Sequence, residues 1–113
     1  MLLFNQHDEP DTDFEREFLR LSSLVADMDH IRHGVPPVAM AGDDAPLLDR
    51  WLLGNVLTPA LLGLSTGHPA LPGTNRPIAT SQVLLMSADM SWARSLSRWY
   101  RLGRPAERSG LGA

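Results

Sequence analysis

The stretch that decides the fold runs from residue 78 to residue 103 and reads IATSQVLLMSADMSWARSLSRWYRLG. Its first ten residues are mostly aliphatic or β-branched and predict a strand over residues 78–87. Alternation along such a strand puts two sets of side chains on opposite faces, Ile78, Thr80, Leu84 and Met86 on one and Val83 and Leu85 on the other.

The last part of this stretch fits two structures. A helix beginning at Trp92 would gather Leu96 and Trp99 on its apolar side, with arginines opposite, and Ser91 and Gly103 would cap its ends. A strand would instead mix arginine with apolar side chains on a single face. The local pattern therefore favours a helix over residues 92–102.

Upstream, residues 67–77 are rich in proline, glycine and other turn residues and predict a loop. Residues 58–64 predict a strand, with Pro59 near its start or on an exposed edge. Before it, Asp43 or Asp44 can cap a short helix with Pro46 in its first turn. The apolar side of this second helix would be formed by Leu47, Leu48, Trp51 and Leu52.

Residues 12–33 carry the clearest helical pattern in the chain. Thr12 and Glu15 have the spacing of a capping box, and Gly34 can end the helix in the left-handed conformation. Apolar residues recur at spacings of three and four, as Phe14, Phe18, Leu21, Val25 and Met28. Five positions are too few for a coiled coil, so we expect this stripe to face the protein's own core.

The composition excludes several classes of site. The chain has no cysteine, so it has no disulfide, thiolate metal site or thiol nucleophile. It has neither a signal-peptide pattern nor an apolar run of the ~20 residues that span a bilayer, and we expect a cytoplasmic protein without a membrane partner. Residues 1–50 have a net charge of −7 and residues 51–113 a net charge of +4, and all basic residues are arginine. This asymmetry can steer a charged partner, or it can let the two halves attract each other.

Three short motifs resemble a module found in small, uncharacterised bacterial proteins. They are the turn Gly67-His68-Pro69, the strand Ile78-Ala79-Thr80-Ser81 and the closing segment Tyr100-Arg101-Leu102-Gly103. The resemblance covers roughly residues 60–104, and the module more often has threonine where this chain has Ser95. It implies that the closing segment is the return strand of a hairpin, and it implies no catalytic residue.

We therefore predict an α+β fold with one long N-terminal helix, a short second helix and a three-stranded antiparallel meander. A C-terminal helix from Trp92 is the rival. Residues 1–10 are expected to form a flexible arm, residues 11–105 a single globular domain and residues 106–113 a flexible tail.

Candidate catalytic and metal-binding residues are few. His30 and His33 lie three residues apart on the first helix, which more often reflects the helix dipole than a metal site. His68 follows Ser65 and Thr66, but no nucleophile motif accompanies it, so a turn histidine that hydrogen-bonds the backbone is the expected role. The glycines match neither a dinucleotide fingerprint nor a P-loop. We predict no catalytic residue, cofactor, metal or small-molecule substrate.

Arginines and aromatic residues alternate near the C-terminus, and this is the candidate partner-binding site. Its residues are Trp92, Arg94, Arg98, Trp99, Tyr100 and Arg101. Such residues are typical of the contacts that dominate protein interfaces. The function we expect is that of a non-enzymatic regulatory or inhibitory protein that binds another protein or itself. The alternative is a nucleic-acid-binding module in which the arginines contact phosphates and the aromatic rings stack on bases.

Overall fold

The computed structural model describes residues 1–5, 8–9 and 11–107. The chain divides into two compact units, one formed by Met1–Glu9 with Leu57–Ala113 and the other by Pro10–Val56. The prediction of one domain over residues 11–105 stays a prediction. Most of the expected tail, residues 108–113, lies outside the described residues, as do residues 6, 7 and 10 of the expected arm.

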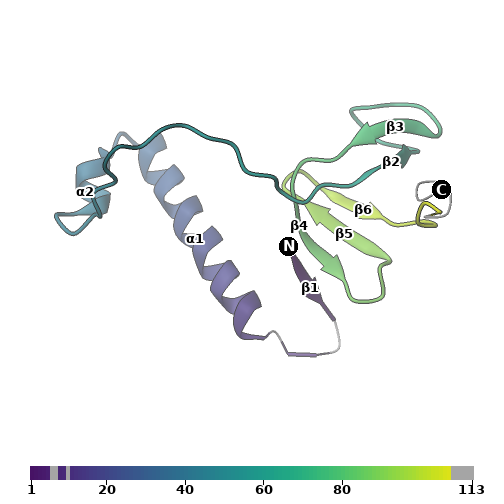
Figure 1. Ribbon diagram of the computed structural model, residues 1–113, viewed down its shortest axis with the longest axis horizontal. Helices are drawn as coiled ribbons and strands as arrows, with labels where there is room; N and C mark the ends of the chain where they lie inside the picture. Colours follow the sequence, from purple (N-terminus) through teal and green to yellow (C-terminus); the bar gives the residue numbers. More distant parts are fainter. Residues whose placement is uncertain (6–7, 10, 108–113) are drawn as a thin grey trace. The chain divides into compact units, whose positions relative to one another are not determined.

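The first unit is built on a four-stranded sheet in the order β1-β4-β5-β6 (Figure 1). Its strands are β1 (Leu2–Phe4), β4 (Val83–Ser87), β5 (Trp92–Ser95) and β6 (Trp99–Arg101). The three strands from β4 to β6 form an antiparallel meander, whereas β1 pairs with β4 in parallel. Together with the long helix of the second unit, this confirms the α+β fold class.

Residues 92–102 form two strands, so the rival helix from Trp92 is wrong. A tight turn through Leu96 and Ser97 joins β5 to β6, closed by a hydrogen bond of 2.9 Å from the Ser95 N–H to the Arg98 carbonyl. Ala93 is fully buried and Ser95 is 1% exposed, which a helix with its apolar side at Trp92 and Leu96 would not produce. Burial of these two small residues outweighs the local helical pattern.

The strand expected over residues 78–87 is divided into two. Residues up to Ala79 belong to β3 (Arg76–Ala79), which pairs with β2 (Leu62–Ser65) as a separate antiparallel hairpin. Beyond β3 the chain still bonds to the segment before β2, because Thr80 and Leu61 exchange hydrogen bonds and the Val83 N–H donates to the Pro59 carbonyl over 2.8 Å. Strand β4 then pairs with β5 and β1. The strand expected over residues 58–64 begins later, at Leu62.

The core of the first unit is small and contains Val83, Met86 and Ala93, with Leu61 and Leu102 packed against it. We expected Val83 and Met86 on opposite faces of their strand, and this was wrong. A register shift between Val83 and Leu85 places an extra residue in β4 opposite β5, so the alternation changes phase and both side chains reach the core.

Strand β1 lies in the stretch for which we expected a flexible arm. Leu2 and Phe4 are half-buried beside β4, and the Ala88 N–H donates to the Phe4 carbonyl over 2.8 Å. Three residues are too few to show the period of a strand, so only the neighbouring strand reveals this one.

The second unit contains α1 (Thr12–Arg32) and α2 (Pro37–Ala41). Asp11, not Thr12, is the N-cap of α1, and its carboxylate accepts a hydrogen bond of 2.8 Å from the Phe14 N–H. Gly34 ends the helix with a φ of 81°, as expected. No residue of α1 is buried, and the described residues of its unit include no strand and no second long helix. The expectation that its apolar stripe faces a core is therefore not met within this unit.

The short second helix exists, but not where we predicted it. Pro37 begins α2 and Gly42, with a φ of 70°, ends it, so the proline pair that stops α1 also starts the next helix. Residues 43–56 form neither helix nor strand, and Trp51 is 72% exposed there. The capping residues Asp43 and Asp44 did not by themselves stabilise a helix here, because most helical stability comes from packing of an apolar side against another surface. Neither described helix is both long and apolar enough to cross a membrane.

Candidate partner-binding surface

The register of β5 and β6 sorts the predicted site residues onto two faces of the sheet. Trp92 pairs with Arg101 and Arg94 with Trp99, so these four side chains share one face. We call this surface, formed by Trp92, Arg94, Trp99 and Arg101, the aromatic–arginine face. Tyr100 pairs with Ala93 and therefore points to the opposite face, toward the core side of the sheet.

The indole rings on the aromatic–arginine face are accessible. Trp92 is 44% exposed and Trp99 is 50% exposed, and their rings meet edge to face with centroids 6.2 Å apart. Phe4 of β1 packs edge to face on Trp99 at 6.0 Å. Sequence reasoning missed Phe4, because only the parallel pairing of β1 brings it to this face. The result is a semi-rigid aromatic cluster with much of its surface exposed.

The arginines of the site form no ion pair with a carboxylate among the described residues. Arg94 donates from Nη1 to the Ser95 carbonyl over 2.7 Å, and this neutral acceptor leaves the positive charge uncompensated. Arg98 has its Nε atom buried without a hydrogen-bond partner. Among residues 1–5, 8–9 and 57–107, no carboxylate forms an ion pair with Arg94, Arg98 or Arg101. This part of the molecule is therefore a cationic surface.

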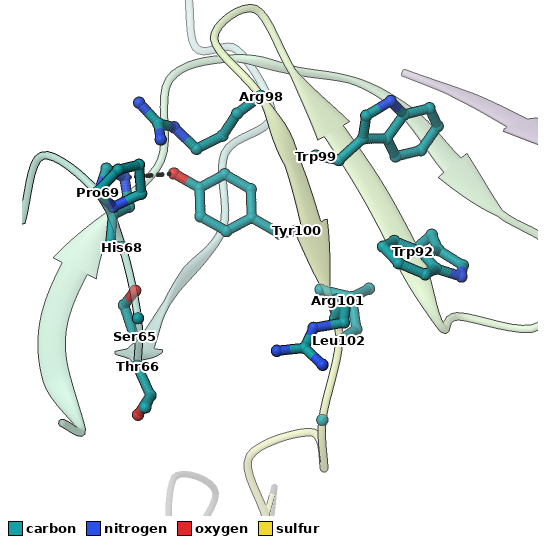
Figure 2. Close-up of a pocket in the computed structure, with 12 residues that line it drawn as sticks. Ser65, Thr66, His68, Pro69, Trp92, Arg98, Trp99, Tyr100, Arg101 and Leu102 are labelled. Carbon is teal, nitrogen blue, oxygen red and sulfur yellow. Dashed lines mark hydrogen bonds between the residues drawn. The ribbon is translucent and has the colours of Figure 1, made fainter.

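A cavity of about 580 Å³ lies between the loop Ser65–Pro69 and strand β6 (Figure 2). The predicted residues that line it are Trp92, Arg98, Trp99, Tyr100 and Arg101. Arg94 is not among them. The end of β2 and the turn after it contribute Ser65, Thr66 and His68, of which the sequence placed only His68 in the predicted loop and none in a site. The lining contains Arg98 and Arg101 and no carboxylate, so the cavity is positively charged, with apolar side chains among its polar groups.

His68 joins the loop to β6 by a short chain of hydrogen bonds. Its Nδ1 atom accepts from the N–H groups of Ala70 and Leu71, both at 3.0 Å, which confirms the expected role of a turn histidine. Its Nε2 atom lies 3.2 Å from the Tyr100 hydroxyl, as Figure 2 shows. Burial lowers the pKa of His68 below its ordinary value of 6.5, and the positive charges of Arg98 and Arg76 lower it further. The imidazole is therefore neutral near pH 7.

The turn between β4 and β5 is held by a carboxylate. Asp89 accepts hydrogen bonds from the Ser91 hydroxyl at 2.6 Å, the Ser87 hydroxyl at 2.7 Å and the Ser91 N–H at 3.0 Å. These bonds, those from Ser91 first, lower the pKa of Asp89. The Asp89 carboxylate stabilises the turn that contains Met90, whose φ is 62°. Asp89 is not among the residues that line the cavity.

The two histidines predicted on the first helix, His30 and His33, lie at its C-terminal end. His33 places its Nδ1 atom 2.7 Å from the Asp29 carbonyl, at the C-terminal end of α1. Across the part of the chain that the structure describes, no group of three or more histidine or carboxylate side chains is placed to hold a metal ion.

No curated protein and no solved structure matches the chain. A family model does match it over residues 34–110, which is more than half of its length and includes every strand except β1. The matched region thus contains the aromatic–arginine face, apart from Phe4 beside it, and the whole cavity lining. The chain belongs to this family, a family of unknown function (DUF6634).

Proposed function

We propose that the protein is a non-enzymatic cytoplasmic regulator or inhibitor that binds another protein through the aromatic–arginine face. The observation that carries this proposal is a pair of half-exposed indoles beside arginines that form no ion pair with a carboxylate among the described residues of the same unit. We also propose that the Gly-His-Pro turn and the Tyr-x-Leu-Gly segment recur in the family, because together they build the cavity beside this face.

The chemistry of this face suits a protein partner. Tryptophan, tyrosine and arginine are the residues whose truncation most often costs 2 kcal/mol or more in a protein interface, as a rough guide. Trp99 is held by ring contacts on two sides, from Phe4 and Trp92, so little side-chain entropy remains to be lost on binding. A partner with apolar side chains and carboxylates would complement both components of the face.

The geometry favours a protein over a nucleic acid. Bases stack on the flat face of an aromatic ring, whereas Trp92 and Trp99 stand edge to face at an interplanar angle of 89° and form no flat platform. The whole chain also has a net charge of −3, whereas nucleic-acid-binding domains usually carry a basic balance.

Affinity capture from the native host with matched tryptophan variants tests the proposal. We expect wild type and Trp51→Ala to retain the same partner, because Trp51 is exposed but lies outside the face. Trp99→Ala should lose it while keeping a folded circular dichroism spectrum. Equal retention by Trp99→Ala would refute the proposal. A partner released by nuclease, together with a gel shift that weakens steeply with salt, would replace it with nucleic-acid binding.

A further inference from the structure

We propose that the cavity between the loop Ser65–Pro69 and strand β6 binds a carboxylate carried on an extended segment of the partner protein. The inference rests on the proposed function and specifies the partner's chemistry. Three features of the described residues support it: the direction of the Tyr100 hydroxyl proton, the guanidinium groups of Arg98 and Arg101 in the lining and the edge position of β6.

The hydrogen bonds of His68 determine which way the Tyr100 hydroxyl donates. A backbone N–H can only donate, so the Nδ1 atom that accepts from Ala70 and Leu71 carries no proton. The proton of the neutral ring is then on Nε2, which donates to the Tyr100 oxygen over 3.2 Å. Because Tyr100 accepts this bond, its own proton remains free to donate to a ligand in the cavity. The site therefore selects a hydrogen-bond acceptor.

Arg98 supplies a second donor and the charge. Its Nε atom is buried, so the part of the guanidinium that can meet a ligand in the cavity is its terminal Nη groups. Arg101 also lines the cavity, and the lining residues include no carboxylate to compete for either guanidinium group. A planar carboxylate matches the two adjacent N–H groups of a guanidinium. Neutral ligands would leave this charge unsatisfied.

The edge of β6 indicates that the carboxylate belongs to an extended chain. The sheet order places β6 at an edge, and residues 98, 100 and 102 direct their backbone bonds to β5. By the alternation of an antiparallel ladder, the N–H and C=O groups of Trp99 and Arg101 point away from β5. A strand added there runs along the border of the cavity, and alternate side chains of that strand face the same side.

A nuclear magnetic resonance titration of the full chain tests the proposal. The probes are a hexapeptide of alternating valine and glutamate with both ends blocked, its glutamine counterpart, sodium acetate and inorganic phosphate. We expect the glutamate peptide to shift the Arg98 Nε–H and Tyr100 ring signals and to bind at least about tenfold more tightly than the glutamine peptide. Tyr100→Phe should weaken it about tenfold, and the exposed control Arg104→Gln should not.

Each other outcome overturns the inference. Equal binding of the two peptides, or no effect of Tyr100→Phe, would show that the cavity recognises no carboxylate. Tighter binding of phosphate would change the ligand class, and binding of acetate without the peptide would assign the site to a free small carboxylate. The capture experiment with Trp99→Ala is independent of these results. If capture of the partner depends on Trp99 but the glutamate peptide does not bind the cavity, the proposed function stands and only this inference is refuted.

Discussion

Replacing Ser95 with alanine tests the turn that carries Arg98. Ser95 is 1% exposed, and its Oγ atom accepts the N–H groups of Ser97 and Arg98, both at 3.1 Å, and donates to the Arg98 carbonyl over 3.3 Å. With alanine the Arg98 carbonyl keeps its bond from the Ser95 N–H, but the N–H groups of Ser97 and Arg98 both lose this acceptor. At about 1 kcal/mol for each lost bond, the free energy of unfolding should fall by about 2 kcal/mol. In a urea titration followed by tryptophan fluorescence, the midpoint should then fall by roughly 1 M.

Ser95→Thr is the matched control. Threonine keeps the hydroxyl on the same carbon and suits a strand end but adds a methyl group to a buried site, so its midpoint should fall less than that of Ser95→Ala. The reasoning is refuted if Ser95→Ala unfolds at the wild-type midpoint, or if threonine lowers the midpoint as much as alanine does.

Three further substitutions test the core and the two titratable turns. Val83 is 1% exposed and packs in the core with Met86, so Val83→Ala should lower the free energy of unfolding by about 2 kcal/mol in a urea titration. An unchanged midpoint would show that Val83 does not contribute to the core. The pKa of Asp89 in the folded protein lies below its ordinary value of 3.8. The ionised carboxylate therefore contributes fully to the free energy of unfolding above pH 3.8, and this contribution is lost as the pH falls through the pKa of the folded state. The stability difference between wild type and Asp89→Asn should therefore disappear in strong acid, and a constant difference would contradict this. The pKa of His68 lies below 6.5, so the unfolded chain binds the proton first and stability falls as the pH drops below 6.5. His68→Gln should remove that part of the pH dependence, measured by urea midpoints between pH 5 and pH 7, and an opposite slope in wild type would contradict the sign.

The sequence predicted the features that depend on neighbouring residues. The end of α1 at Gly34, the α+β class and the backbone-bonded histidine turn at His68 all follow from local chemistry. Local patterns were misleading where distant residues decide. The pattern of residues 92–102 by itself favours a helix, and the meander was predicted there only from the resemblance of the closing segment; in the structure Ala93 and Ser95 are buried in the strand that pairs with β4.

The candidate site was predicted in part for the same reason. Alternating arginines and aromatic residues identified one face, but the cavity needs the loop with His68 and the aromatic cluster needs Phe4. His68 lies 32 residues from Tyr100 in the chain, and no local periodicity links them. That the four residues of the aromatic–arginine face share one side of the sheet likewise became clear only from the register of β5 and β6.

Site-specific photocrosslinking tests most directly whether the aromatic–arginine face contacts another protein. A photoreactive phenylalanine analogue is placed at Trp99 or, as the exposed control, at Trp51, and the chain is irradiated in its native host. We predict a discrete crosslinked product with one other protein from position 99 and none with that protein from position 51. The same product from both positions, or none from position 99, would contradict the proposed binding face.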